Sequence, residues 1–504
     1  MKVFKTSQIK SIDAYTIENE PIESIDLMER AATAIFNWFR SKYHKNRRIK
    51  IFCGPGNNGG DGLALARLLI NTGFNAHCYY LKADSYSADF LTNLDRLKEL
   101  TPELFLVKHQ SDFPEIHTDD LVVDALYGSG LSRSIEGVAA QLIEHINSSG
   151  AKVIAIDIPS GLFGEANPVP NNNPVVKSDY CLSLQFPKLA FFMPENEQFL
   201  KRWVVLPIGL HTEAIENTAT PYHYTTASSI KTDFFQLSTF AHKGTYGHAL
   251  VIAGSNGMMG AACLCAKSVV RSGVGLVTMH IPKVGYTIAQ VNVPEALTSI
   301  DSCETHITQF PELYRYQAVC VGPGIAQSTE TDQMLVKLIK TCQLPLVVDA
   351  DGLNLLSRNI DVLNSVNNAL ILTPHPGEFD RLFGKSQCSW ERLERAREMA
   401  QKYGVIIVLK GAYTRVVLPS GNVHFNSTGN PGMATGGSGD VLSGIITGLL
   451  ARGLPPADAA ITGVYIHGLA GDLAADEFGQ ISLCASDIVN YICKAFQHIT
   501  NNDE

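Results

Sequence analysis

The sequence predicts an α/β protein of two domains, each built on a parallel β-sheet that is covered by helices. Two observations lead to this prediction. The chain has 504 residues, which is more than one ordinary hydrophobic core holds. Short apolar runs that suit buried strands alternate with helical patterns along most of the chain, and this alternation is typical of parallel sheets.

The first alternating series occupies roughly the first 210 residues. Strands are expected at residues 49–52, 76–81, 121–124 and 153–158, with helices at 63–71 and 139–146. Ligands of parallel sheets bind beyond the carboxyl ends of the strands. The segments that follow three of these strands begin at Cys53, Asp124 and Asp157, so we expect a binding site there.

The alternation breaks after residues 203–210, where a polar stretch without clear periodicity follows. We therefore predict a first domain over residues 1–212, a linker over 213–230 and a second domain over 231–504. Strands of the second domain are expected at residues 248–254, 318–321, 346–349, 369–373, 405–410 and 414–418, with helices at 260–272 and 388–403.

Composition narrows the classes of function. An apolar content of 45% and a charged content of 18% suit a globular enzyme and argue against disorder. The net charge of −9 offers no basic surface for nucleic acid, and no apolar run reaches the length of a membrane span. The eleven cysteines lack zinc-site spacing, and the chain starts without a secretory signal. We therefore expect a cytoplasmic protein with buried, reduced thiols.

Three motifs of the first domain carry its chemistry. Gly54–Gly62 reads GPGNNGGDG and lies between a strand and a helix, where backbone N–H groups bind phosphate. It is neither a Walker A loop nor a GxGxxG fingerprint. Its two Asn amides can bind phosphate oxygens or a hard cation. Asp124–Ser134 and Asp157–Leu162 read DALYGSGLSRS and DIPSGL, and they bring further glycines and carboxylates to the same edge of the sheet.

Together these motifs resemble the NAD(P)H-hydrate epimerases, also called the YjeF N-terminal domain, over roughly the first 210 residues. The resemblance implies a Rossmann-like, three-layer domain that interconverts the R and S forms of hydrated NADH or NADPH. It assigns K⁺ to Asn58, Asp124 and Ser160, and it makes Asp157 a substrate contact and the candidate acid/base. Lys188, in a further family-like segment, is expected on the surface. The resemblance assigns substrate binding to Asn57, Asn58, Gly59, Gly60, Asp61, Gly128, Ser129, Gly130, Leu131, Ser132, Arg133, Ser134 and Asp157.

The most informative segment of the second domain is Asn426–Asp440, which reads NSTGNPGMATGGSGD. Its glycines let backbone N–H groups approach an anion closely, and a helix that starts at Gly439–Asp440 would add its positive end. Asp440 then lies where a base could meet a substrate hydroxyl. Further motifs are TPHPGE with His375 and Glu378, KGAYT with Lys410, and VDADGLN at residues 348–354.

These motifs resemble the ribokinase-like superfamily, and specifically ADP-dependent NAD(P)H-hydrate dehydratase, from about Thr225 onward. The family's GPGLG turn reads GPGIA here, with Ala326 in the last position, and its VPEM segment reads VPEA. The resemblance implies that Mg²⁺ bridges the phosphates, with Glu378 as the leading candidate for an indirect role. It assigns ADP to Lys410, Gly411, Ala412, Tyr413, Thr414, Gly436, Gly437, Ser438 and Gly439. It assigns the hydrated nucleotide to Ala261, Gly324, His375 and Asp440.

The implied reaction has a clear chemical logic. Hydroxide leaves poorly, so phosphoryl transfer from ADP to the hydroxyl at nicotinamide C6 would create phosphate, a good leaving group. Asp440 would take the hydroxyl proton during that transfer. Two alternatives remain: a ribokinase-like kinase of a small alcohol, and a first domain that only binds a nucleotide or mediates self-association. ADP against ATP, and NADH hydrate against NADPH hydrate, stay open. Family members tend to self-associate, so a homo-oligomer is expected.

Overall fold

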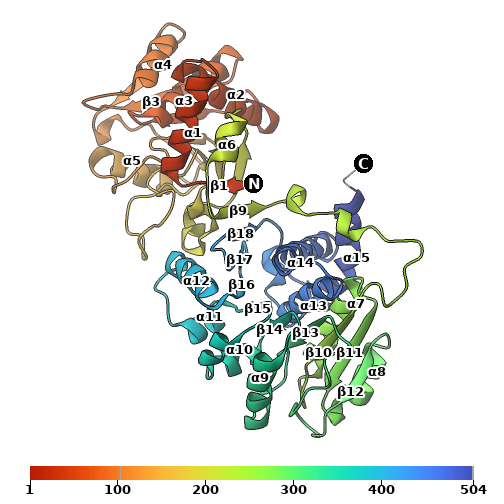
Figure 1. The fold of residues 1–504 in the computed structure, drawn as a ribbon. Helices are drawn as coiled ribbons and strands as arrows, with labels where there is room; N and C mark the ends of the chain where they lie inside the picture. Colours follow the sequence, from red (N-terminus) through yellow and green to blue (C-terminus); the bar gives the residue numbers. More distant parts are fainter. Residues whose placement is uncertain (103, 502–504) are drawn as a thin grey trace. The chain divides into compact units, whose positions relative to one another are not determined.

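The computed structural model describes residues 1–102 and 104–501 and contains two compact units (Figure 1). The N-terminal unit comprises Lys2–Thr220 with Cys388–Trp390, and the C-terminal unit comprises Pro221–Gln387, the chain from Glu391 onward and Met1. The prediction of two α/β domains is confirmed. The predicted linker contains a short helix, α6 (Thr212–Asn217), and a strand, β9 (Tyr222–Thr225).

The N-terminal unit is built on a sheet in which every strand pair is parallel. The strand order is β4-β3-β2-β5-β6-β7-β8. The order reverses between β2 and β5, and in open α/β sheets this is where a crevice for ligands opens. The strands are β2 (Ile49–Cys53), β3 (Ala76–Leu81), β4 (Leu104–Val107), β5 (Leu121–Ala125), β6 (Lys152–Ile156), β7 (Tyr180–Leu184) and β8 (Trp203–Leu206).

Helices cover both faces of this sheet, which gives three layers. Apolar residues of α2, α3 and α4 share one core with the sheet, and those of α5 share another core with its opposite face. The helices are α1 (Thr6–Asn19), α2 (Ser24–Lys42), α3 (Asn57–Asn71), α4 (Ala88–Lys98) and α5 (Gly137–Ser148).

The start of α3 differs from the prediction. The sequence favoured a helix from Leu63, but α3 begins at Asn57, inside the glycine-rich motif. The reason is tertiary packing: a Cβ at Gly62 would lie 2.6 Å from the Cβ of Ala125, so glycine lets the helix approach strand β5 closely. The motif is therefore the first two turns of a helix, and its side chains point from that helix.

The C-terminal unit has a longer sheet, in the order β9-β18-β17-β16-β15-β14-β13-β10-β11-β12. Its pairs from β12 to β16 are parallel, whereas β17 pairs antiparallel with both β16 and β18. The order reverses between β10 and β13. The remaining strands are β10 (His248–Ile252), β11 (Leu276–Ile281), β12 (Leu297–Ile300), β13 (Ala318–Val321), β14 (Leu346–Val348), β15 (Leu370–Leu372), β16 (Ile406–Leu409), β17 (Arg415–Val417) and β18 (Val423–Asn426).

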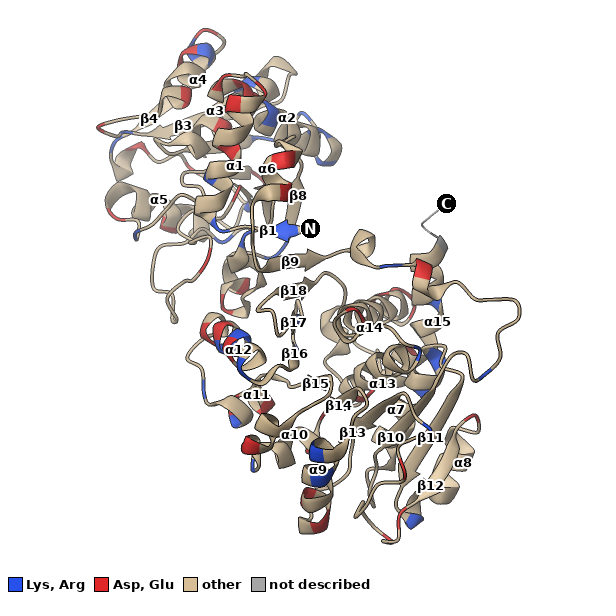
Figure 2. Ribbon diagram, viewed as in Figure 1, with Lys and Arg blue, Asp and Glu red and all other residues tan. Residues whose placement is uncertain are grey.

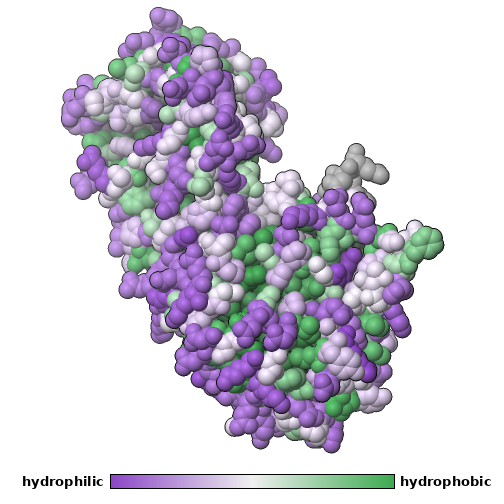
Figure 3. Space-filling model, viewed as in Figure 1, coloured by the Kyte–Doolittle hydropathy of each residue, from purple (hydrophilic) through white to green (hydrophobic). Residues whose placement is uncertain are grey.

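The main core of this unit lies between the sheet and four helices, α7, α13, α14 and α15. Hydrophobic residues are visible around α13 and α14 in Figure 3. The helices are α7 (Met259–Arg271), α8 (Tyr286–Asn292), α9 (Thr329–Thr341), α10 (Asp351–Leu356), α11 (Pro376–Phe383), α12 (Ser389–Tyr403), α13 (Ser438–Ala451), α14 (Pro456–Phe478) and α15 (Ala485–Asn501).

Charged residues of both signs are interspersed along α12 (Figure 2), where Arg395 pairs with Glu391 at 2.7 Å. On α9 the signs are separated, with Glu330 and Asp332 in the first turn and Lys340 in the last. All eleven cysteines are free, but the expectation that they are buried is wrong for Cys484 and Cys493, which are exposed. Among the described residues, no helix combines the length and apolarity that a membrane span requires.

Candidate functional sites

In the N-terminal unit, Asp124 is fully buried at the end of β5 and is bound to the DIPSGL loop. Its Oδ1 accepts a hydrogen bond from the Ser160 hydroxyl (2.6 Å), and its Oδ2 accepts one from the Ser160 N–H (2.8 Å). Burial raises the pKa of Asp124 to about 6, although the donors from Ser160 oppose this. A pair of oxygens from Asp124 and Ser160 therefore stands at the point where the strand order reverses.

Asn58 gives the clearest sign of a missing partner. Its side chain is buried, and neither its amide nitrogen nor its amide oxygen has a hydrogen-bond partner. A Cβ placed at Gly128 would lie 3.3 Å from this side chain, so the loop after β5 covers it closely. Buried polar atoms are rarely left unpaired. An amide oxygen, a carboxylate and a hydroxyl are oxygen ligands of the kind that hard cations accept, so Asn58, Asp124 and Ser160 have the chemistry to hold one.

Asp157 follows β6 with a left-handed backbone, at φ = 64°. Its Oδ1 forms an ion pair with the Lys188 ammonium at 2.6 Å, and its Oδ2 accepts the Ser129 N–H at 3.1 Å. Burial opposes the charged form, but Lys188 and Ser129 outweigh it and lower the pKa of Asp157. The expectation of a surface Lys188 is wrong, because this side chain is 2% exposed.

The charge of Asp157 helps to raise the pKa values of two other carboxyl groups, those of Asp61 and Asp13. Burial raises the pKa of Asp61 well above its usual value, and Asp157 and Asp13 add to this effect. Burial also raises the pKa of Asp13, on α1, to about 6. Of the remaining predicted residues, Ser132, Arg133 and Ser134 are exposed in the loop after β5.

In the C-terminal unit, the glycine-rich loop ends at the start of α13. Gly437 has φ = 90°, and a Cβ there would come within 2.5 Å of Leu264, so the turn requires glycine. Asp440 is the third residue of α13. Burial raises its pKa to about 7 with help from the negative charge of Asp349, while Lys410 acts in the opposite direction. This carboxyl group is therefore poised to exchange a proton near neutral pH.

Lys410 does not point freely to solvent. Its ammonium binds Asp349 Oδ1 at 2.8 Å and lies 3.8 Å from Glu378 Oε2. Burial favours the neutral amine, but the two carboxylates raise the pKa of Lys410. A Cβ placed at Gly439 would lie 3.2 Å from Lys410 Nζ, so this cation lies directly beside the first turn of α13.

A cavity of about 410 Å³ opens next to this cluster, at the carboxyl ends of β10 and β13. Its position is the crevice where the strand order reverses. The predicted residues Ala261, Gly324 and Asp440 all line it, and Glu378 does so as well. The other lining residues are Gly257, Met258, Gly260, Ala350, Asp351 and Asn354.

His375 occupies a different position. It is the N-cap of α11, where its Nδ1 accepts the Gly377 N–H at 3.0 Å. Its own N–H donates to Glu378 Oε2 at 2.7 Å, which completes a capping box. The His375 side chain is about half exposed and does not line the cavity. Its assignment to the hydrated nucleotide stays a prediction.

Ala326, the altered position of the GPGIA turn, has a backbone conformation that is unfavourable for alanine. Ala326 has φ = 63°, a left-handed conformation that a glycine adopts without strain. Its N–H donates to Asp351 Oδ2 at 3.2 Å, and Asp351 lines the cavity. The backbone of Ala326 thus connects this turn to a residue of the cavity wall.

Sequence reasoning missed several residues of both sites. Asp349 is 1% exposed, yet it holds Lys410 and accepts the Ser443 hydroxyl at 2.5 Å. Its position at the end of β14, inside the motif VDADGLN, was the available signal. Lys188 lies in a segment that the sequence analysis singled out, but it was placed on the surface. Asp13 gave no comparable signal, because it does not follow a strand in the glycine-rich manner of the other motifs.

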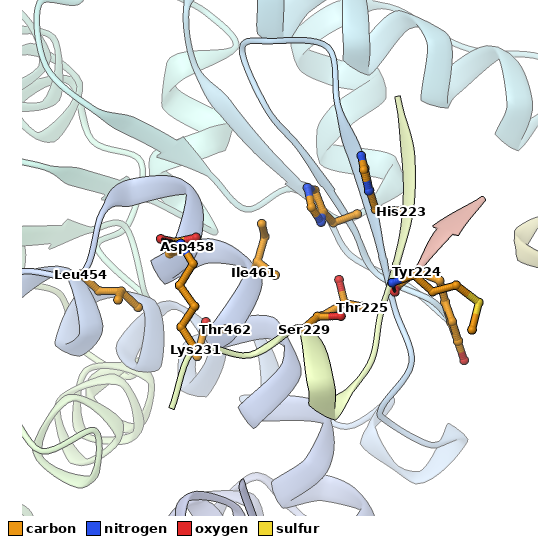
Figure 4. Close-up of a pocket in the computed structure, with 11 residues that line it drawn as sticks. His223, Tyr224, Thr225, Ser229, Lys231, Leu454, Asp458, Ile461 and Thr462 are labelled. Carbon is orange, nitrogen blue, oxygen red and sulfur yellow. Dashed lines mark hydrogen bonds and ion pairs between the residues drawn. The ribbon is translucent and has the colours of Figure 1, made fainter. Parts of the chain in front are cut away.

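A smaller cavity of about 190 Å³ lies elsewhere in the C-terminal unit (Figure 4). His223 on β9 and His424 on β18 stack in its wall with ring centroids 4.8 Å apart, and Lys231 pairs with Asp458 across from them at 2.9 Å. Among the described residues, no three His, Cys, Asp or Glu side chains gather closely enough to hold a metal ion.

Comparison with known families agrees with the two-unit organisation. The family described as YjeF-related protein N-terminus matches residues 24–190, and the family described as NAD(P)H-hydrate dehydratase matches residues 249–494.

Similar proteins span the whole chain. The bifunctional NAD(P)H-hydrate repair enzyme Nnr of Moorella thermoacetica is 34% identical, over 98% of this chain and 96% of that protein. Its namesake from Escherichia coli is 32% identical, over 92% of this chain and 88% of that protein. Among solved structures, the ADP/ATP-dependent NAD(P)H-hydrate dehydratase of Bacillus subtilis, co-crystallised with ATP and Mg²⁺, is 31% identical with a TM-score of 0.48. It covers 55% of this chain and 98% of its own.

Proposed function

Because the chain belongs to the family of bifunctional NAD(P)H-hydrate repair enzymes, we propose that it performs two consecutive repair reactions. The N-terminal unit interconverts the R and S forms of hydrated NADH or NADPH. The C-terminal unit dehydrates the S form with ADP and releases AMP and phosphate. The full-length similarity supports both reactions in one chain.

The observation that carries the dehydratase proposal is Asp440 in its cavity. It lines a space at the sheet's crevice, and its pKa of about 7 suits a general base at neutral pH. The backbone N–H groups at the start of α13 and the Lys410 ammonium lie next to it and would hold the phosphates of ADP. Mg²⁺ would bind chiefly to phosphate oxygens and water, with Glu378 nearby.

The proposed epimerase site uses Asp157 against the substrate and the segments 57–61 and 128–134 to bind it. Asn58, Asp124 and Ser160 would hold K⁺. The unpartnered amide of Asn58 supports this donor set, because a cation would satisfy its oxygen. We also propose a homo-oligomer, from the family resemblance, and a cytoplasmic location, from the unpaired cysteines. Light scattering of the purified protein would test the first, and cell fractionation would test the second.

One experiment tests both reactions. A mixture of R and S hydrates is incubated with the protein and either ADP or ATP, and the return of the reduced-nicotinamide absorbance is followed. Complete recovery of the mixture supports both activities, and recovery of half supports the dehydratase alone. No recovery with either nucleotide contradicts the proposal. The ratio of the two rates gives the nucleotide preference.

The kinase alternative is not favoured. A ribokinase-like kinase would leave a stable phosphorylated alcohol as product. If the same incubation yields such a product without new absorbance, the kinase reading replaces the dehydratase.

A further inference from the structure

Helix α1 lies outside the matched family segment, residues 24–190, yet it packs against the loops of the epimerase site. The N–H of Thr6 donates to Glu165 Oε1 at 2.6 Å, and Thr6 Oγ1 lies 2.4 Å from the position that a Cβ at Gly164 would take. The Lys10 ammonium lies 3.5 Å from the position of a Cβ at Gly130, over the predicted substrate loop.

Helical spacing puts Asp13 on the same face. Residues 6, 10 and 13 lie within about 60° of one another around a helix of 3.6 residues per turn. Ile9, Ile12 and Thr16 form the adjacent, buried face. Asp13 is therefore directed toward the site and not toward the hydrophobic core.

We propose that Asp13 is a second catalytic carboxyl group of the epimerase site and donates a proton to the departing C6 hydroxyl. This inference rests on the proposed epimerase function. Asp157 is itself a poor proton donor, because its two oxygens accept from fixed donors, Lys188 and Ser129. The acid of this site is therefore expected to be a different residue from Asp157.

The charged groups that face Asp13 from other elements are Asp157 and Lys188 after the strands and Asp61 on α3, and Lys10 shares its face of α1. Burial and the negative charge of Asp157 raise the pKa of Asp13 to about 6, and Lys188 opposes them. Asp61 is the competing donor, but it is only 8% exposed, whereas Asp13 is half-buried. A half-buried acid regains its proton from solvent in each cycle.

The proposed reaction has two steps, the loss of water from C6 and the return of water to the opposite face of the ring. The lone pair of the ring nitrogen N1 forms an N1=C6 double bond as the C6–O bond breaks, and the oxygen leaves as water with the proton of Asp13. Water then bonds to C6 on the other face of the cationic ring, and the N1=C6 electrons return to N1. Asp157 takes the proton that this addition releases, and solvent carries it back to Asp13. A weak base suffices, because the protonated hydroxyl is a strong acid.

The test measures R/S exchange in the full chain without ADP, from pH 5 to 8, with the spontaneous rate subtracted. The wild-type rate should fall as pH rises through about 6, because the protonated acid is the active form. Asp13→Asn should slow exchange about 10²-fold and remove this dependence with little change in KM. Asp13→Glu should restore part of both.

Matched variants decide between the candidates. Asp61→Asn and Glu18→Gln, the latter exposed on the same helix, should keep the pH dependence. The inference is overturned if Asp13→Asn keeps the wild-type rate and profile, or if Asp61→Asn loses the dependence instead. A wild-type protein that does not exchange the hydrates contradicts the proposed epimerase function itself.

Discussion

Asp157 in the N-terminal unit and Asp440 in the C-terminal unit both lie close to the point where the strand order of their sheet reverses. Asp157 follows β6, the strand next to β5, and Asp440 lines the cavity at the ends of β10 and β13. Each has a lysine nearby, which is buried beside Asp157 and partly buried beside Asp440. Their pKa values nevertheless move in opposite directions, below the usual value for Asp157 and up to about 7 for Asp440.

The position of the lysine explains the difference. Lys188 binds Asp157 directly at 2.6 Å, whereas Lys410 binds Asp349, and the negative Asp349 then faces Asp440. One unit therefore has a carboxylate that stays ionised, and the other has a carboxyl group that exchanges its proton near neutral pH. A lysine that binds the aspartate directly keeps that aspartate ionised. A lysine that binds a neighbouring carboxylate instead leaves the aspartate able to take up a proton near neutral pH.

The largest expected effect tests the role of Asp440. Asp440→Asn should reduce ADP-dependent dehydration of the S hydrate at least about 10²-fold, because no base remains to take the hydroxyl proton. R/S exchange by the same preparation serves as the control and should be unchanged. Normal absorbance recovery by this variant would remove Asp440 from the mechanism.

The matching change in the other unit is Asp157→Asn. It should reduce enzyme-dependent R/S exchange about 10²-fold while the S hydrate is still consumed with ADP. A hydrate mixture would then lose its S form quickly and its R form only at the spontaneous rate. Rapid consumption of the whole mixture would show that Asp157 is dispensable.

The pH dependence of dehydration follows from the pKa of Asp440. The base must be ionised, so the rate should rise with pH through about 7 and level off above it. Initial rates on purified S hydrate from pH 5 to 9 measure this. A rate that falls over this range contradicts a base with the pKa of Asp440.

A smaller effect tests the influence of Asp349. Asp349→Asn removes a negative charge near Asp440 and frees Lys410, so the rising limb should move about one pH unit toward acid. Asp351→Asn serves as the matched control, because Asp351 ranks below both Asp349 and Lys410 in its effect on Asp440. Equal movement in both variants would contradict the assignment to Asp349.

The smallest effect is on stability. The pKa of Asp440 is about 7 when folded against 3.8 for the free side chain, so its ionisation in the folded protein lowers stability as pH rises between these values. Asp440→Asn should therefore be more stable than wild type at pH 8 and should lose this advantage near pH 4. Thermal melts at both pH values measure the difference.

Much of the fold could be predicted from periodicity. The strand cores at 49–52 and 346–349, for example, coincide with β2 and β14, because a continuous apolar run between turn residues has few other structures available. The edge strands β4, β8 and β12 were missed, and each is only partly buried, so its sequence lacks the apolar run that identifies a central strand. The inner strands β7, β11 and β18 were missed as well, although they are largely buried, because polar residues such as Ser183 and His280 interrupt their apolar runs.

The site could be predicted only where local sequence determines it. Glycine-rich loops and strand-end carboxylates are local signals, and the predictions for Asp124, Asp157 and Asp440 rest on them. The partners that set the charges of these groups come from distant positions. Lys188 lies 31 residues beyond Asp157 and Lys410 lies 61 residues beyond Asp349, and no periodicity links them. Tertiary packing alone pairs them.

The close packing around the start of α3 also limits which substitutions the glycine-rich motif tolerates. A Cβ at Gly54 would collide with the carbonyl of Leu126, and one at Gly59 with the carbonyl of Gly54, whereas one at Gly56 would meet nothing within 4 Å. Three glycines within six positions thus differ sharply in their tolerance of mutation. A saturation library over this motif should accept alanine at Gly56 and reject every side chain at the other two. Backbone contacts within the fold therefore restrict the residue types at Gly54 and Gly59 independently of any ligand.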